Sequence, residues 1–267
     1  MDYLDTLENK SVYVIREAYS RFRNIAMLWS IGKDSTTLLW LCRKAFFGKI
    51  PFPIIHIDTT FKFKEIYEFR DRYVKDWDLN LIISKNEAAI EKGISPTKND
   101  KFSCCNSLKT EALKTTLKQY DFKALLLAIR RDEHGIRAKE RYFSPRNINF
   151  EWNYANQPAE LWDQYKSKSV TEEHIRVHPM LHWTELDIWR YIQREKIPVV
   201  GLYFAKGGKR YRSIGCETCC QAIDSQAENI KKIIKELQTT KIAERAGRAQ
   251  DKEQAYMMQK LRSLGYM

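Results

Sequence analysis

The residues of this 267-residue chain best suited to chemistry lie in the stretch SIGKDSTT, residues 30–37. An apolar run precedes it and a helical pattern follows, so we expect a strand-to-helix turn. The first N–H groups of a helix have no partner inside the helix, and the helix dipole adds positive charge there. Gly32 permits close approach of an anion and Lys33 adds a full charge. Hydroxyl groups come from Ser30, Ser35 and Thr36.

This pattern predicts a phosphate site, with a merely well-capped helix as the plainer interpretation. It is not a Walker P-loop, because the second glycine of that motif is absent. Two further polar stretches follow apolar runs: Asp58 ends PFPIIHID (51–58), and RRDEHGIRAKER (130–141) follows KALLLAI. An exposed helix with ion pairs would explain the basic stretch. Its position favours a functional role, since parallel sheets bind ligands beyond the carboxyl ends of their strands.

Five of the six cysteines fall in two tight groups. Cys104 and Cys105 are adjacent, and CETCC supplies Cys216, Cys219 and Cys220. Four thiolates suit an iron–sulfur cluster or zinc, because soft ligands select those metals over Mg²⁺. A redox dithiol and small buried core residues are the alternatives.

Alternating strands and helices must position these groups. We expect strands at 25–29, 51–60, 79–85 and 123–129, and helices at 10–22, 36–47, 64–77, 106–120 and 227–240. Thr184 with Asp187 predicts the start of another helix. The alternation predicts an α/β fold with a doubly wound, mainly parallel sheet and helices on both faces. Residues 1–200 would form the α/β domain and residues 201–267 a C-terminal extension.

Composition restricts the class of protein. The net charge of +12 favours an anionic partner such as a nucleotide, an oxyanion or nucleic acid, although a solvated lysine surface would explain it equally well. No apolar run is long enough to span a membrane, and the N-terminal stretch lacks the apolar segment of a secretory signal. We therefore expect a cytoplasmic protein without a membrane partner, in which cysteines stay reduced.

SIGKDS after a strand resembles the pyrophosphate loop of the adenine-nucleotide α-hydrolase (PP-loop ATP pyrophosphatase) superfamily, which includes the PAPS reductases. Further blocks resemble, in order and over essentially the whole chain, the small catalytic subunits of bacterial sulfate adenylyltransferases. These blocks are PFPIIHIDTTFKFKEIYEFRDR, LKTEALK, RRDEHGIRAKER, HPMLHWTELDIWRYI, RYRSIGC and AERAGRAQDKEQA.

The resemblance implies a nucleotidyltransferase that moves the adenylyl group of ATP to sulfate and releases pyrophosphate. It assigns the nucleotide to Ser30, Gly32, Lys33, Asp34, Ser35, Thr36, Asp58, Arg245 and Arg248 in a domain over which the C-terminal extension packs. The catalytic set it implies is Lys33, Arg130, Arg131, Asp132, Arg137, Lys139 and Arg141, with Asp132 holding an arginine. Asp34 and Asp58 are candidate Mg²⁺ ligands, and contact with the nucleoside is the alternative for Asp58.

Two departures from this family keep other functions open. The connection between 201–205 and 210–216 is short, so an insertion is missing, which argues against a GTPase large subunit as partner. The CC and CxxC groups resemble the [4Fe–4S] pattern of adenylyl-sulfate reductases, giving Cys104, Cys105, Cys216 and Cys219 as ligands.

A cluster-dependent sulfur-inserting enzyme that adenylates its substrate is therefore an alternative. An adenylyl-sulfate reductase is another, although the tail LRSLGYM has no nucleophilic cysteine. A nucleic-acid-binding module is less favoured, because it would leave the 30–35 turn without a role.

Overall fold

The computed structural model describes residues 2–163, 165, 174–245, 248 and 257–266. A six-stranded sheet with the order β3-β2-β1-β4-β6-β5 forms the centre. All neighbouring strands are parallel except β5, which is antiparallel to β6. The strands are β1 (Ile25–Leu28), β2 (Ile54–Ile57), β3 (Leu81–Ser84), β4 (Ala124–Leu126), β5 (Phe143–Arg146) and β6 (His174–Val177). The doubly wound, mainly parallel sheet is confirmed.

The central strands are apolar because helices cover both faces of the sheet. Every residue of β1, β2 and β4 is buried, whereas the edge strand β3 is mostly half-buried or exposed. Strands of parallel sheets that are buried on both faces have nearly continuous apolar sequences. Met27 of β1 pairs with both Ile54 and Leu126, so the carboxyl ends of these three strands lie at one edge.

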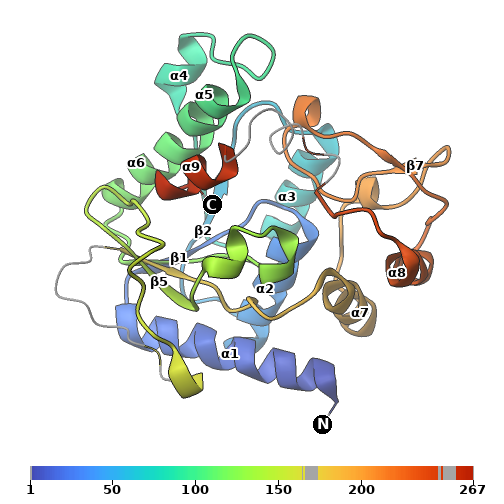
Figure 1. Ribbon diagram of the computed structural model, residues 1–267, viewed down its shortest axis with the longest axis horizontal. Helices are drawn as coiled ribbons and strands as arrows, with labels where there is room; N and C mark the ends of the chain where they lie inside the picture. Colours follow the sequence, from blue (N-terminus) through green and yellow to red (C-terminus); the bar gives the residue numbers. More distant parts are fainter. Residues whose placement is uncertain (1, 164, 166–173, 246–247, 249–256, 267) are drawn as a thin grey trace.

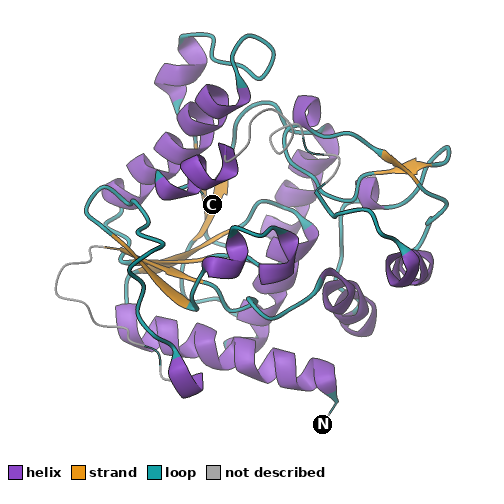
Figure 2. Ribbon diagram, in the orientation of Figure 1, coloured by secondary structure: helices purple, strands orange, loops and turns teal. Residues whose placement is uncertain are grey.

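Helices flank the sheet on both sides (Figures 1 and 2). The longer helices are α1 (Tyr3–Phe22), α2 (Lys33–Ala45), α3 (Lys64–Asp76), α6 (Ala112–Gln119), α7 (Glu185–Glu195) and α8 (Ile230–Thr239). The shorter ones are α4 (Glu87–Glu91), α5 (Lys101–Cys105) and α9 (Met257–Ser263). In Figure 1, α1 lies below the sheet and α6 and α9 lie above it. Among the described residues, no helix combines the length and apolar character needed to cross a membrane.

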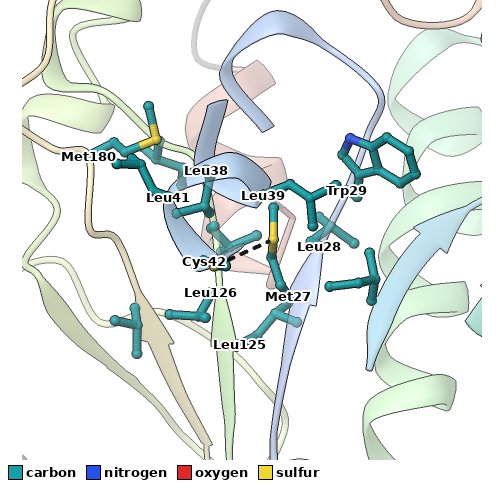
Figure 3. Close-up of a cluster of buried hydrophobic side chains, with 14 of the residues drawn as sticks. Met27, Leu28, Trp29, Leu38, Leu39, Leu41, Cys42, Leu125, Leu126 and Met180 are labelled. Carbon is teal, nitrogen blue, oxygen red and sulfur yellow. Dashed lines mark hydrogen bonds between the residues drawn. The ribbon is translucent and has the colours of Figure 1, made fainter. Parts of the chain in front are cut away.

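The core forms where α2 packs on β1 and β4 (Figure 3). Met27 of β1 and Leu38, Leu39 and Leu41 of α2 are fully buried there. Cys42 is also fully buried, and its Sγ lies 4.0 Å from the Met27 sulfur. This cysteine is therefore a packing residue.

Three elements differ from the sequence prediction. Helix α1 begins seven residues earlier than 10, because Asp2 and Asp5 form a capping box. The expected helix 106–120 begins with a π-helical segment, Asn106–Glu111, that follows α5. Strands β5 and β6 are not among the strands that the sequence predicts. Strand β6 was missed because His174 and Arg176 give it a polar sequence, although both residues are buried.

Residues beyond 200 pack around the carboxyl edge of the sheet. A two-stranded sheet, β7 (Lys209–Arg210) with β8 (Ile223–Asp224), precedes α8, which packs on α7. Residues Met257, Met258 and Leu261 of α9 pack against Cys105. The proposed boundary at residue 200 stays a prediction. Thr184 does start α7, through a capping box with Asp187.

Candidate active site

The predicted phosphate loop is a tight turn between β1 and α2. Gly32 is the N-cap of α2, which begins at Lys33, and Ile31 has a φ of 67°. A β-branched residue in the left-handed region is strained, and such strain is concentrated at functional sites. The hydroxyls of Ser30 and Ser35 lie 3.0 Å apart. The turn therefore has the predicted geometry, with its helix amides at the carboxyl edge of the sheet.

Protein groups already occupy part of this turn. The Lys33 backbone N–H donates to the Tyr203 hydroxyl at 2.8 Å. The Thr36 hydroxyl accepts from the Trp29 indole at 3.1 Å, which turns it toward the core. A Cβ added at Gly32 would lie 3.5 Å from the Tyr203 hydroxyl, so packing alone does not require glycine there.

A buried ion-pair network surrounds the first residues of α2. The Lys33 side chain is 1% exposed and its Nζ contacts Asp34 at 3.0 Å and also Glu244. The fully buried Arg130 guanidinium donates to Asp34 at 2.6 Å, to Asp132 at 2.5 Å and to Glu244. Glu244 places one carboxylate oxygen on each of the two cations. Below, these five residues are called the loop end of the site.

The charges of the loop end stabilise one another. Burial alone lowers the pKa of Lys33 and of Arg130, but the carboxylates of Asp34 and Glu244 raise both above their ordinary values. Burial raises the pKa of Glu244, yet Arg130 and Lys33 together hold it well below the ordinary value. The pKa of Asp132 is raised, because burial outweighs the effect of Arg130. Lys33, Arg130 and Glu244 are therefore charged at neutral pH.

A cavity that is partly open to solvent adjoins the loop end. Its wall includes Ser30, Gly32 and Ser35 of the phosphate loop and Tyr203. Six basic side chains line it: Lys33, Lys62, Lys109, Arg137, Arg245 and Arg248. The cavity is therefore suited to a polyanion.

Two of these arginines share one carboxylate on the cavity wall. Arg245 contacts Glu133 at 3.2 Å, and Arg137 pairs with the other oxygen of the same group. Burial and the charge of Arg245 lower the pKa of Arg137 well below its ordinary value. An anion in the cavity would relieve this repulsion.

At the far end of the cavity, three cations face sulfur atoms. Lys109 Nζ lies 3.7 Å from Cys105 Sγ, and an Arg248 Nη donates to Cys220 Sγ at 2.8 Å. Lys62 forms a backbone bridge with Cys216. Among the described residues, none of these cations pairs with a carboxylate. Below, the thiol end of the site means Lys62, Lys109, Arg248, Cys105, Cys216 and Cys220.

Local backbone explains how two of these cations reach the cavity. Lys109 lies in the π-helical segment Asn106–Glu111, and such segments often mark functional sites. The Arg248 guanidinium lies against Gly215, where an added Cβ would overlap it, so this position requires glycine.

Among the described residues, the thiol end contains three cations and no carboxylate. Burial lowers the pKa of Lys62, and the charges of Lys109 and Arg248 lower it further, against the opposing effects of Cys216 and Cys220. A hydrogen bond from Cys219, supported by Lys109 and Lys62, lowers the pKa of Cys216 to about 3 despite its burial. Cys216 is therefore a thiolate at neutral pH, one negative group among three cations.

The cysteines do not form the predicted cluster site. Cys104, Cys105, Cys216 and Cys219 are all buried, and Cys216 is hydrogen-bonded to Cys219. Burial and the neighbouring Cys105 raise the pKa of Cys104 to about 11, so it remains a thiol. Within the described ranges, no three His, Cys, Asp or Glu side chains approach closely enough to hold a metal ion. The ligand set that the CC and CxxC spacing predicts is not assembled.

Three basic residues of the stretch 130–141 point away from the cavity. Arg131 and Arg141 line a second cavity, where Arg131 contacts His182 at 2.6 Å. Arg141 donates to the Pro158 carbonyl at 3.2 Å, and Lys139 is exposed. Of the predicted catalytic arginines, the structure brings only Arg130 and Arg137 to the site.

Asp58 lies at the carboxyl end of β2 but does not line the cavity. Its carboxylate accepts from the Thr60 N–H and the Tyr67 hydroxyl, each at 2.8 Å, and contacts Lys85 at 3.2 Å. These partners outweigh burial and lower its pKa. Neither assignment that the sequence leaves open for Asp58 is decided by this geometry.

Sequence reasoning missed four residues of the site: Lys62, Lys109, Tyr203 and Glu244. Lys109 follows Cys105 by four residues, and this spacing on a helix was an available signal. Glu244 directly precedes the predicted Arg245. Nothing in the sequence marks Lys62 or Tyr203, because only the tertiary fold brings them to the cavity.

Comparison with known proteins first shows the general class of protein to which this chain belongs. Residues 24–222 match the model of the family described as phosphoadenosine phosphosulfate reductase domain. The FMN adenylyltransferase of Candida glabrata with ATP has a TM-score of 0.56 at 18% identity, over 81% of this chain and 62% of its own. The phosphoadenylyl-sulfate reductase of Candida auris has a TM-score of 0.54 at 18% identity, over 80% and 98%. Together with the family match, these likenesses show an adenine-nucleotide α-hydrolase-like fold.

Proteins of similar sequence identify a narrower family within this class. Sulfate adenylyltransferase subunit 2 of Geotalea daltonii is 40% identical, and that of Psychromonas ingrahamii 41%, over 100% of this chain and 98% of each relative. The chain therefore belongs to the sulfate adenylyltransferase subunit 2 family. The alignments run over 296 positions against 267 residues here, so the relatives contain residues without a counterpart in this chain, as a missing insertion predicts.

Proposed function

We propose that this chain is a nucleotidyltransferase that transfers the adenylyl group of ATP to sulfate and releases pyrophosphate. The observation that carries the proposal is one cavity with two unlike cationic ends, because the reaction needs two anions held close together. Membership of the sulfate adenylyltransferase subunit 2 family supports it. A sulfate oxygen attacks the α-phosphorus, a new P–O bond forms, and the bond to the β-phosphate oxygen breaks.

The loop end is where we place pyrophosphate. The N-terminal amides of α2 and the Lys33 ammonium are donors for phosphate oxygens. Arg137 and Arg245 on the facing wall would neutralise charge that develops on the transferred group. Catalysis of this kind rests on positioning and electrostatics rather than on a covalent intermediate.

The thiol end is where we place sulfate. Lys62, Lys109 and Arg248 line the cavity and have no carboxylate partner in the described part of the chain. A dianion there would supply the missing counter-charge. Because both ends belong to one cavity, a sulfate oxygen would face the α-phosphate of a nucleotide whose pyrophosphate lies on α2.

Magnesium is the expected companion of the phosphates. Mg²⁺ is usually held by one or two carboxylates and by substrate phosphates. Asp34 is the carboxylate nearest the loop, but both of its oxygens are engaged, by Lys33 at 3.0 Å and Arg130 at 2.6 Å. We therefore propose that Mg²⁺ arrives with ATP and that Asp34 is its protein ligand, with Asp58 the alternative.

We further propose that the chain works with a larger partner subunit, as the name of its relatives implies for those proteins. Adenylyl sulfate formation is strongly uphill, so a partner that supplies free energy, such as a GTPase, fits the chemistry. The missing insertion predicts that such a partner contacts this chain differently from the longer relatives. The cytoplasmic location expected from the sequence stays part of this proposal.

An iron–sulfur enzyme is the second candidate, favoured by one observation. Cys104, Cys105, Cys216 and Cys219 are all buried, and two of them, Cys105 and Cys216, belong to the thiol end. Their present arrangement does not fit a cluster, and no step of the reaction above involves one. Iron and acid-labile sulfide measured after anaerobic purification separate the candidates: adenylyl transfer predicts full activity without iron, whereas about four irons per chain would favour sulfur insertion or reduction.

The reverse reaction tests the proposed function, because it runs downhill. The full chain is supplied with adenylyl sulfate, pyrophosphate and Mg²⁺, and ATP is measured by luminescence. We expect ATP formation that falls at least tenfold in Lys33→Ala and is unchanged in Lys64→Ala, an exposed lysine of α3. No ATP from the wild-type chain, alone or with its partner subunit, would contradict the proposal.

A further inference from the structure

Glu244 occupies the position of an anionic ligand at the loop end. It is 9% exposed and comes from the segment after α8, far in sequence from the phosphate loop. One carboxylate oxygen contacts Lys33 and the other contacts Arg130. Two oxygens of a phosphate group would bind the same pair of cations in the same way.

The charge balance leaves no room for both Glu244 and a phosphate. With Glu244 in place, three carboxylates (Asp34, Asp132 and Glu244) surround two cations, Lys33 and Arg130. The loop end thus already carries an excess of negative charge. A triphosphate entering this cluster would be repelled unless a carboxylate departs.

The segment that carries Glu244 is fixed by three other contacts. We call residues 241–245 and 248 the strap. The Ile242 carbonyl accepts from Arg212 at 2.6 Å, and Arg245 contacts Glu133 at 3.2 Å. Arg248 pairs by a backbone bridge with Cys220. The strap therefore holds Glu244 in place and brings two arginines to the cavity wall.

We propose that Glu244 is a built-in competitor of the nucleotide phosphates: it neutralises Lys33 and Arg130 in the ligand-free chain, and ATP or pyrophosphate displaces it. This inference rests on the proposed function only for the identity of the ligand. Release of Glu244 frees the strap to rearrange, so that the neighbouring Arg245 can meet the bound phosphates. Displacement costs binding energy, and part of the phosphate affinity is therefore spent on opening the strap.

Direct binding tests this proposal without requiring catalysis. The dissociation constants of inorganic pyrophosphate and of ATP are measured by calorimetry for the full-length wild type and for Glu244→Gln. The amide keeps the shape but removes the charge, so we expect both constants to fall at least threefold. An unchanged or larger constant would overturn the proposal, because Glu244 would then assist binding or be neutral to it.

Two matched variants serve as controls for this experiment. Glu236→Gln removes a carboxylate that pairs with the buried Arg210 at 2.6 Å outside the cavity, and it should leave both constants unchanged. Glu244→Asp keeps the charge but is too short to bridge both cations, so it should also bind pyrophosphate more tightly than wild type. If Glu244→Gln does not fold, the aspartate variant decides the matter: binding no tighter than wild type overturns the proposal.

The outcomes also separate this proposal from the proposed function. Tighter pyrophosphate binding in Glu244→Gln, without ATP formation from adenylyl sulfate, would support Glu244 as a competitor of phosphate and would reject adenylyl transfer as the function. ATP formation with equal pyrophosphate binding in wild type and variant would support adenylyl transfer and reject Glu244 as a competitor. Absence of binding in wild type and variants alike would reject both.

Discussion

The two ends of the cavity contain similar cations in opposite electrostatic settings. At the loop end, Lys33 and Arg130 are enclosed by three carboxylates, whereas at the thiol end Lys62, Lys109 and Arg248 face sulfur atoms. Burying an unpaired charge is costly, and groups with strongly perturbed pKa values concentrate at functional sites. The thiol end can therefore accept an anion, whereas at the loop end the carboxylate of Glu244 already occupies that position.

This contrast separates two ways of binding an oxyanion. At the thiol end a dianion adds to cations that have no carboxylate partner in the described part of the chain, so no ion pair with a described carboxylate has to break. At the loop end a phosphate must replace Glu244, so binding and rearrangement are coupled. The account predicts that substitutions at the two ends have different effects on stability, pyrophosphate affinity and sulfate affinity.

The largest effect is expected from Arg130→Ala. Its guanidinium is fully buried and contacts three carboxylates, which would be left without their main partner. Breaking a buried network in this way costs on the order of 3 to 5 kcal/mol. Urea unfolding of the variant measures the loss, and Arg72→Ala, at an exposed pair, should change stability by less than about 1 kcal/mol. A loss of stability below about 1 kcal/mol in Arg130→Ala would contradict the claim that Arg130 is the main partner of the loop-end carboxylates.

The next effect concerns Lys33→Ala. Removal of a charged phosphate contact should lower kcat/KM for ATP synthesis from adenylyl sulfate tenfold or more, which is about 1.4 kcal/mol. Pyrophosphate affinity should fall as well, while stability changes less than in Arg130→Ala, since Asp34 keeps Arg130 as a partner. A variant with normal pyrophosphate affinity would show that the loop end does not bind phosphate.

Substitution of Lys109 should act on the other substrate. We expect Lys109→Ala to raise KM for adenylyl sulfate about tenfold and to leave the dissociation constant of pyrophosphate within twofold of wild type. Steady-state kinetics and calorimetry provide the two numbers. Lys114→Ala, on the adjoining helix α6 and paired with Glu111 at 3.5 Å, is the control. Equal effects on both ligands would remove the distinction between the two ends.

A separate effect concerns acid stability and involves His56, a fully buried residue of β2. Its Nδ1 contacts the Trp29 carbonyl at 2.9 Å, and burial, aided by the charge of Lys62, lowers its pKa to about 4. Between pH 6.5 and 4 the unfolded chain binds a proton that the folded chain does not. Stability should therefore be complete above pH 6.5 and fall toward pH 4, by on the order of 3 kcal/mol from this group.

Urea titrations at several pH values measure this slope. His56→Asn should flatten it by one proton, whereas His182→Asn, at the second cavity, should not. A His56→Asn variant with an unchanged slope would show that His56 is protonated in the folded chain.

The sequence predicted the parts of this molecule that depend on local pattern. Apolar runs identified β1, β2 and β4, and the Gly32–Lys33 turn was recognised from residue types alone. Strand β6 was not, because His174 and Arg176 give it a polar sequence although both are buried, where each contacts a carbonyl distant in the chain.

The site was predictable to a similar extent. Arg130 follows a strand end, and the structure brings it to the loop end, while its catalytic role stays a prediction. Arg131 and Arg141 come from the same basic stretch, but they line another cavity. The pairing of Glu244 with Lys33 spans 211 positions, and no local pattern encodes it.

Exchange of labelled pyrophosphate into ATP, with and without sulfate, tests the central claim most directly. If the cavity holds sulfate at one end and pyrophosphate at the other, the full chain with its partner subunit exchanges label only when sulfate is present, and Lys33→Ala exchanges at least tenfold more slowly. Exchange at the same rate without sulfate would contradict the account, because the adenylyl acceptor would then be something other than the anion of the thiol end.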